Sequence, residues 1–267
     1  MSESPRAVVF TDLDGTLLDA ETYDPTPARD ALERLLEERI PVVPVTSKTL
    51  AETERWAERL GLGNVPLVVE SGGALRLTGG RVELVGTPYP ELRAALADFG
   101  KEIGRPLIGF GDLTEAEVAA RTGLAIDEAR DARLRLADEP FFADPPLTAE
   151  ESAVLERTAE RRGLHLESGG RFLHLLGRSD KGKAVTRVLA WYESRAGQRP
   201  HAVGIGDAAN DRAFLAVVDR AFAVRRPDGS VARELADVPG IRITDSPGPR
   251  GFDEAIRLWL TERTEER

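Results

Sequence analysis

Short apolar runs that alternate with amphipathic segments constrain the fold of this chain more than any other feature. Residues 7–10, 41–45 and 66–69 are apolar and end in polar turns, whereas residues 32–38 and 50–60 have the spacing of amphipathic helices. Continuous apolar runs of this length are typical of strands buried in a parallel sheet, and the helices between them supply the crossovers. We therefore expect an α/β fold with a Rossmann-like, three-layer core around a parallel sheet.

The alternation of apolar runs with helical segments stops in the middle of the chain, which indicates an inserted α+β domain. Helical segments and a short hairpin replace the regular alternation there, and the alternation resumes afterwards. We predict a core domain formed by residues 1–85 and 178–267 and an inserted domain formed by residues 86–177. The predicted elements are helices at 90–99, 114–121, 147–162, 183–193, 211–218 and 252–261, a hairpin of 164–167 with 172–176, and strands at 202–205 and 221–224.

Composition and charge exclude several classes of function. Cysteine is absent from the 267 residues, so disulfides, thiolate metal sites and cysteine nucleophiles are excluded. The formal net charge of −10 provides no broad basic surface, and we expect neither nucleic acid nor an anionic membrane as a partner. No apolar run is long enough to span a bilayer, and the first ten residues lack the features of a secretory signal, so the expected location is cytoplasmic.

Asp12 and Asp14 follow the first apolar run, and Gly15 after them allows the chain to turn sharply. Residues two apart in an extended backbone point the same way, so both carboxylates face one place. A lone Asp-Gly pair would more simply cap the strand, but the second aspartate favours a reactive site. Ligands collect at the carboxyl ends of parallel strands, which is where these carboxylates are expected.

The second apolar run ends in a similar way at Thr46, Ser47 and Lys48. The hydroxyl and the backbone N–H of Thr46 suit a phosphate oxygen, with Ser47 and Lys48 beside them. The alternative is that Thr46 is an ordinary helix N-cap, and for this residue taken alone that alternative is favoured.

Two polar segments of the second half complete the candidate site. Lys181 is expected at the start of a helix, where the macrodipole disfavours a cation unless an anion is close. Asp207, Asn210 and Asp211 follow the apolar run 202–205, and their oxygens form a set that suits Mg²⁺ better than zinc or copper. The alternatives are a solvated lysine and a helix cap at Asn210 or Asp211.

An Asp pair, a Thr, a Lys and a second Asp pair in this order resemble the motifs of the haloacid dehalogenase-like phosphatases. The chain has no G-x-G-x-x-G after its first strand and no G-x-x-x-x-G-K-[ST], which excludes dinucleotide and P-loop sites. The resemblance implies a Mg²⁺-dependent phosphatase with Asp12 as nucleophile and Asp14 as acid and base. It also implies phosphate contacts from Thr46 and Lys181, and a cap role for the inserted domain. The implied metal ligands are Asp12, Asp14 through its carbonyl, Asp207 and Asp211.

Further segments look like those of mannosyl-3-phosphoglycerate phosphatases. They are TSKT at 46–49, EVAARTGL at 117–124, EPF at 139–141, GRFLH at 170–174 and DKG at 180–182. This resemblance spans nearly the whole chain, and it implies that the substrate is a small phosphorylated glycoside. Ser47, Lys48 and Asn210 are the substrate-binding candidates of the core.

Arginines of the inserted domain offer cations for a second anionic group of such a substrate. Arg135 and Arg171 are the candidates, although each arginine taken singly is more simply a solvated side chain. Three other functions stay open from the sequence: a broad-specificity sugar-phosphate phosphatase, a hexose phosphomutase, and a sugar-phosphate binding module without catalysis. The intact Asp12, Asp14, Lys181 and Asp207 argue against the last of these.

Overall fold

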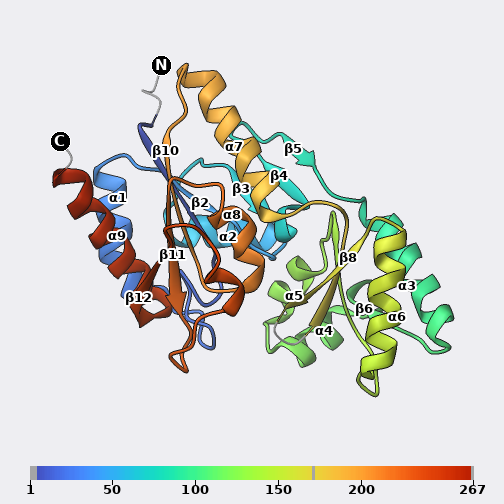
Figure 1. Cartoon of the computed structure of the whole chain (residues 1–267). Coiled ribbons are helices and arrows are strands. Elements are labelled where there is room, and N and C mark those ends of the chain that lie inside the picture. Colours follow the sequence, from blue (N-terminus) through green and yellow to red (C-terminus); the bar gives the residue numbers. More distant parts are fainter. Residues whose placement is uncertain (1–4, 170–171, 266–267) are drawn as a thin grey trace.

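The computed structural model describes residues 5–169 and 172–265, and a five-stranded parallel sheet forms its centre (Figure 1). The strand order is β12-β11-β10-β1-β2, and each neighbouring pair is parallel. All five residues of β1 are buried, which explains the continuous apolar run in its sequence. The strands are β1 (Ala7–Thr11), β2 (Val42–Pro44), β10 (His201–Gly206), β11 (Arg220–Arg225) and β12 (Arg242–Pro247).

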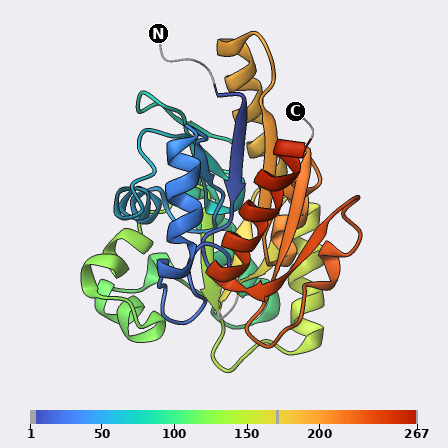
Figure 2. The same cartoon turned by 90° about the vertical axis from the view of Figure 1, so that its left-hand side faces the viewer.

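Helices cover both faces of this sheet and complete the three layers that the sequence predicts. Figures 1 and 2 show α1 and α9 side by side on one face, with α7 and α8 on the other. The apolar faces of these helices and both faces of the sheet form one large hydrophobic core. The helices are α1 (Arg29–Glu37), α2 (Leu50–Arg59), α7 (Lys181–Ala196), α8 (Arg212–Leu215) and α9 (Gly248–Glu265).

The third apolar run forms β3 (Leu67–Val69), but most of its hydrogen bonds lie outside the parallel sheet. It pairs antiparallel with β4 (Ala74–Arg76), which pairs in turn with β5 (Val82–Leu84). A single parallel bridge between Val45 and Val68 connects β3 to the chain just after β2. The predicted third strand is therefore present, but its ladder partner is β4, because a tight turn sends the chain straight back along it.

A four-stranded antiparallel sheet lies between β5 and α7 in the sequence and forms the inserted α+β unit (Figure 1). One face of the sheet packs on two long helices and forms a second hydrophobic core, while two short helices lie against part of the other face. The strands, in the order β6-β7-β9-β8, are β6 (Ile108–Gly109), β7 (Asp138–Phe142), β9 (Phe172–Leu176) and β8 (His165–Gly169). The helices are α3 (Tyr89–Ile103), α4 (Glu115–Thr122), α5 (Ile126–Ala132) and α6 (Ala149–Arg161).

The structure confirms the predicted fold class and the β8–β9 hairpin, and it adds elements that the sequence did not indicate. α5 and β12 were not predicted, because α5 has only seven residues and β12, with four of its six residues exposed, is not a continuous apolar run. The domain boundaries at residues 86 and 177 stay predictions. Within the described residues, none of the helices combines the length and the apolar content that crossing a bilayer requires.

Candidate active site

The carboxyl ends of β1 and β10 bring together the acidic residues that the sequence placed far apart. Asp12 follows β1 and Asp207 follows β10, and the two strands are hydrogen-bonded neighbours in the sheet. The Asp12 N–H also donates to the Ile205 carbonyl over 2.9 Å. The predicted convergence of these two sites is therefore a direct consequence of the strand order.

Lys181 is the buried cation of this cluster. Its Nζ donates to Asp12 Oδ1 over 2.8 Å and to Asp211 Oδ1 over 2.6 Å, and its side chain is 2% exposed. It is the first residue of α7, directly after the N-cap Asp180. Burial favours a lower pKa for Lys181, but the attraction of Asp12 and Asp211 outweighs burial and raises the pKa, so the side chain stays charged.

The site holds more negative than positive charge. Burial raises the pKa of Asp12 well above its ordinary value; Lys181 opposes this rise, and the neighbouring aspartates add to it. Burial and the adjacent Asp211 also raise the pKa of Asp207 to about 7, although the Thr16 hydroxyl, which donates to Asp207 Oδ1 over 2.8 Å, acts the other way. Three buried carboxylates thus share one ammonium group, and a bound cation would relieve their repulsion.

The same three carboxylates fit a divalent metal. Among the described residues, Asp12, Asp207 and Asp211 offer oxygen atoms that all lie within 4.8 Å of one another. An all-oxygen set suits a hard divalent cation. The Asp211 carboxylate already has hydrogen bonds at both of its oxygens, because its Oδ1 accepts from Lys181 and its Oδ2 accepts the N–H groups of Asp207 and Ala208 over 2.9 Å. Asp12 and Asp207 are therefore the better side-chain ligands, and Asp211 holds Lys181 and the loop that carries Asp207.

Asp14 lies at the edge of the cluster and forms an ion pair with Lys48. Its carboxylate, 38% exposed, bonds Lys48 Nζ over 2.9 Å and is not one of the three clustered carboxylates. Gly15 holds the turn after it with a φ of 81°, and a Cβ there would lie 2.9 Å from Asp207 Oδ2. Glycine at this position therefore serves both the backbone conformation and the close approach of Asp207. A metal contact through the Asp14 carbonyl stays a prediction.

Thr46 is placed beside the site but not as a helix cap. The N-cap of α2 is Thr49, whose hydroxyl accepts the Glu52 N–H while Glu52 accepts the Thr49 N–H. The Thr46 hydroxyl accepts the Lys48 N–H over 3.2 Å, and its own N–H donates to the Val68 carbonyl. The expectation that this N–H holds a phosphate oxygen is wrong, because the bond to Val68 in β3 uses it, whereas the hydroxyl stays a candidate.

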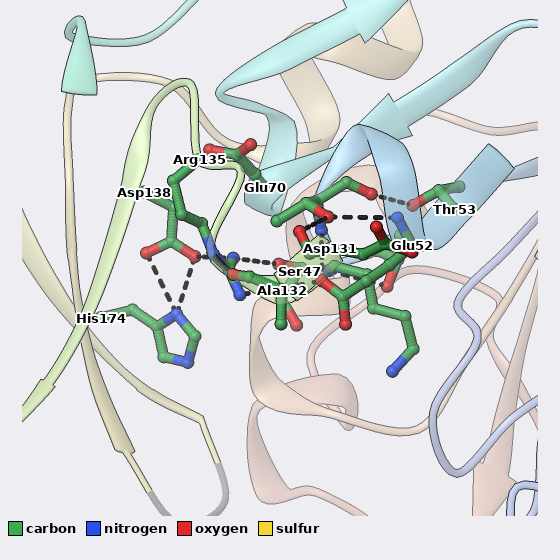
Figure 3. A network of polar contacts seen from close by, with 12 residues as sticks. Ser47, Glu52, Thr53, Glu70, Asp131, Ala132, Arg135, Asp138 and His174 are labelled. Carbon is green, nitrogen blue, oxygen red and sulfur yellow. Dashed lines mark hydrogen bonds and ion pairs between the residues drawn. The ribbon is translucent and has the colours of Figure 1, made fainter. Parts of the chain in front are cut away.

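Asn210, Arg135 and Arg171, three further substrate-binding candidates, differ in their surroundings. Asn210 Oδ1 is buried without a hydrogen-bond partner among the described residues. Arg135 is buried and donates to the Ser47 carbonyl over 2.9 Å and to Asp138 over 3.0 Å (Figure 3), so its guanidinium bonds protein groups in this structure. A substrate contact from Arg135 stays a prediction, and Arg171 lies outside the described residues.

Two residues at the junction of core and inserted unit were not among the site candidates named from the sequence. Glu70 comes from a turn in which Glu70 and Ser71 both have positive φ, and its buried carboxylate accepts the N–H groups of Leu136 and Ala137. His174 Nδ1 bonds the Asp138 carboxylate over 2.8 Å (Figure 3). The signal for Glu70 was an acidic residue directly after an apolar strand, and its partners could not be read from the sequence, because they are backbone groups more than sixty residues away.

Comparison with known proteins identifies the family. A family model described as haloacid dehalogenase-like hydrolase matches residues 9–82. A glucosyl-3-phosphoglycerate/mannosyl-3-phosphoglycerate phosphatase of Methanococcoides burtonii is 35% identical over 94% of this chain and 96% of its own length. The chain belongs to the family of these phosphatases. A relative with the same name from Persephonella marina is 36% identical over 96% of the chain and 97% of its own length.

Solved structures share the fold of this family member at lower identity. A sugar phosphatase of haloacid dehalogenase subclass IIB has a TM-score of 0.68 at 16% identity, covering 95% of this chain and 99% of its own. The sucrose-phosphatase of Synechocystis has a TM-score of 0.61 at 16% identity, covering 96% of this chain and 98% of its own. The resemblances drawn from the motifs are thus confirmed for the family and the fold.

Proposed function

We propose that this protein is a Mg²⁺-dependent phosphatase that hydrolyses mannosyl-3-phosphoglycerate to mannosylglycerate and phosphate. The observation that carries the proposal is the buried Asp12 carboxylate, bonded to Lys181 and clustered with Asp207 at the tip of the parallel sheet. The relatives that are named as glucosyl-3-phosphoglycerate/mannosyl-3-phosphoglycerate phosphatases support the substrate. Their names make the glucosyl compound the second candidate substrate.

Asp12 acts as the nucleophile in this proposal. Its Oδ1 accepts the bond from Lys181, which leaves Oδ2 to attack phosphorus. A bond forms between Oδ2 and phosphorus while the ester P–O bond breaks, which gives an aspartyl-phosphate and an alkoxide. Asp14 donates a proton to that alkoxide and then takes a proton from the water molecule that attacks the aspartyl-phosphate. Inorganic phosphate leaves, and both carboxyl groups return to their starting states.

The remaining residues hold the phosphoryl group and balance its charge. In this proposal the Lys181 ammonium and the Thr46 hydroxyl contact its oxygens, while Ser47, Lys48 and Asn210 are assigned to the rest of the substrate. Asp12 and Asp207 would hold Mg²⁺, together with the Asp14 carbonyl. When bound, this ion screens the repulsion between the Asp12 carboxylate and the phosphate.

The size of the rate acceleration supports these roles for the nucleophile, the acid and the cations. Enzymes accelerate phosphate-monoester hydrolysis by up to about 10²¹, and a general acid supplies only about 10²–10⁴ of such a factor. Most of the acceleration must therefore come from a positioned nucleophile and from charge stabilisation. The buried cluster of Asp12, Lys181 and Asp207 provides both in one place.

Replacing Asp12 with asparagine tests the proposal. We expect phosphate release from mannosyl-3-phosphoglycerate to fall by at least about 10⁴, because the amide is a far weaker nucleophile. Far-UV circular dichroism checks that the fold is kept, and Asp30→Asn on the surface of α1 is the matched control. Wild-type turnover in the Asp12→Asn variant would refute the nucleophile assignment. Release of phosphate without a bisphosphorylated activator separates the phosphatase from a phosphomutase.

A further inference from the structure

A hollow of about 1530 Å³ lies at the amino ends of β1 and β2, and none of its lining residues belongs to 86–177. Its walls come from α1, from the carboxyl ends of α2 and α7, and from the turn between α1 and β2. Figure 1 shows the N-terminus and the carboxyl end of α7 on the side of the core away from the inserted unit. The clustered carboxylates follow the carboxyl ends of β1 and β10, and the five residues of β1 alone extend about 16 Å. The hollow is therefore separate from the candidate active site.

The walls of this hollow are strongly basic, although the whole chain is acidic. Six arginines and two glutamates line it, an excess of four positive charges in a chain with a formal net charge of −10. Because a recess lined by charges of one sign focuses their field, this excess attracts anions more strongly than the same arginines would on a flat surface. The arginines are Arg6, Arg29, Arg39, Arg59, Arg195 and Arg263, and the glutamates are Glu33 and Glu38.

Four of these arginines have no carboxylate partner within residues 5–169 and 172–265. Only two are paired: Arg263 bonds Glu38 over 2.8 Å, and Arg59 lies 3.4 Å from a glutamate of α5. The Arg195 guanidinium lies 4.9 Å from the centre of the Trp191 ring, which orients the side chain without neutralising its charge. Guanidinium groups bind phosphate oxygens through paired hydrogen bonds. Several unpaired ones around one recess suit an anion with several phosphate groups better than a single carboxylate.

Arg39 occupies a backbone position that glycine would fill at lower cost. It follows the last turn of α1 with a φ of 56°, in the left-handed region that disfavours a Cβ. The corresponding positions after α2 and α6 hold Gly61, with a φ of 64°, and Gly163, with a φ of 70°. The Arg39 side chain is exposed, so packing in the core does not explain an arginine there. An anion in the hollow would give this guanidinium a partner.

We propose that this hollow is a binding site for a small polyphosphate anion, held by Arg6, Arg29, Arg39 and Arg195. The inference goes beyond the proposed function and does not depend on it, because the clustered carboxylates take no part in the site. Free inorganic polyphosphate and the triphosphate group of a nucleotide both carry this chemistry.

Isothermal titration calorimetry of the full chain with sodium tripolyphosphate tests this inference. EDTA in the buffer removes divalent cations that would bridge the anion to the catalytic carboxylates. We expect tripolyphosphate to bind at least about tenfold more tightly than sulfate or orthophosphate at equal ionic strength, because it presents more phosphate oxygens and more charge to the arginines. Equal affinity for all three anions would mean general screening of a basic surface and would refute the site.

Arg39→Gly separates binding from folding. Glycine relieves the left-handed backbone, so the midpoint of urea unfolding should stay at or above that of wild type while the affinity for tripolyphosphate falls severalfold. The double variant Arg39→Gly with Arg195→Gln should lose at least about tenfold. Arg34→Gln is the matched control, because Arg34 is exposed on α1 but does not line the hollow, and its affinity should equal that of wild type.

Two further titrations identify the source and the place of the anion. Tighter binding of ATP than of tripolyphosphate would identify a nucleotide as the ligand, and equal or weaker binding would identify the polyphosphate group alone. Asp12→Asn should bind tripolyphosphate as wild type does, since Asp12 follows the opposite end of β1. Loss of binding in that variant, or wild-type affinity in both Arg39→Gly and the double variant, would overturn the inference and leave the phosphatase proposal standing.

Discussion

Replacing Glu70 with glutamine is expected to remove a large part of the pH dependence of folding stability. The Glu70 side chain is fully buried, and its carboxylate accepts the N–H groups of Leu136 and Ala137. Burial raises the pKa of Glu70 from its usual 4.5 to about 7, while Arg135 and these N–H bonds lower it and Asp138 raises it further. The folded state therefore binds this proton more tightly than the unfolded state does.

The sign and size of the effect follow from that difference. Between pH 4.5 and about 7 the folded protein holds more protons than the unfolded chain, so stability falls as the pH rises through this range. At ~1.36 kcal/mol for each pH unit, the total loss is about 3 kcal/mol, and most of it falls between pH 5 and 8. Glutamine does not titrate, so the variant lacks this loss. As the pH rises through this range, the unfolding free energy of Glu70→Gln should therefore increase by that amount relative to that of wild type.

Urea unfolding at pH 5, 6, 7 and 8 measures this difference directly. Glu54→Gln is the matched control, because its carboxylate is 45% exposed and pairs with Arg76 at the surface, where such pairs contribute about 0–1 kcal/mol. Parallel curves of stability against pH for wild type and Glu70→Gln would refute the reasoning, since they would mean that Glu70 titrates equally in both states.

Three other predictions concern the catalytic cluster. In the burst phase, before the aspartyl-phosphate is hydrolysed, Asp14→Asn should slow the release of poor alkoxide leaving groups by about 10²–10⁴ and the release of 4-nitrophenolate much less, and equal burst-phase losses for both would contradict an acid role. Lys181→Met should destabilise the protein by about 3–5 kcal/mol in urea unfolding, because Asp12 and Asp211 lose their shared cation; the Asp211→Asn double variant should recover part of this. Chelation with EDTA should stop phosphate release and added Mg²⁺ should restore it, and activity that is indifferent to both would exclude a metal site.

The core and the candidate catalytic residues could be predicted from the sequence, because their signals are local. The apolar runs at 7–10 and 202–205 each end in aspartates, and neighbouring parallel strands must bring their carboxyl ends together. The family resemblance drawn from these motifs is confirmed by the relatives. The roles assigned to Asp12, Asp14 and Lys181 stay predictions that the variants above test.

The contacts between the core and the inserted unit could not be predicted from local patterns. Glu70 binds backbone groups of the inserted unit, and Arg135 of that unit bonds the Ser47 carbonyl of the core. The bond from the Thr49 hydroxyl to the Asp131 carbonyl likewise depends on α5 lying against α2. None of these contacts has a sequence signature, because each joins segments distant along the chain and several use backbone groups that every residue carries. Local patterns fix which side chains are available, and long-range packing decides which of them meet.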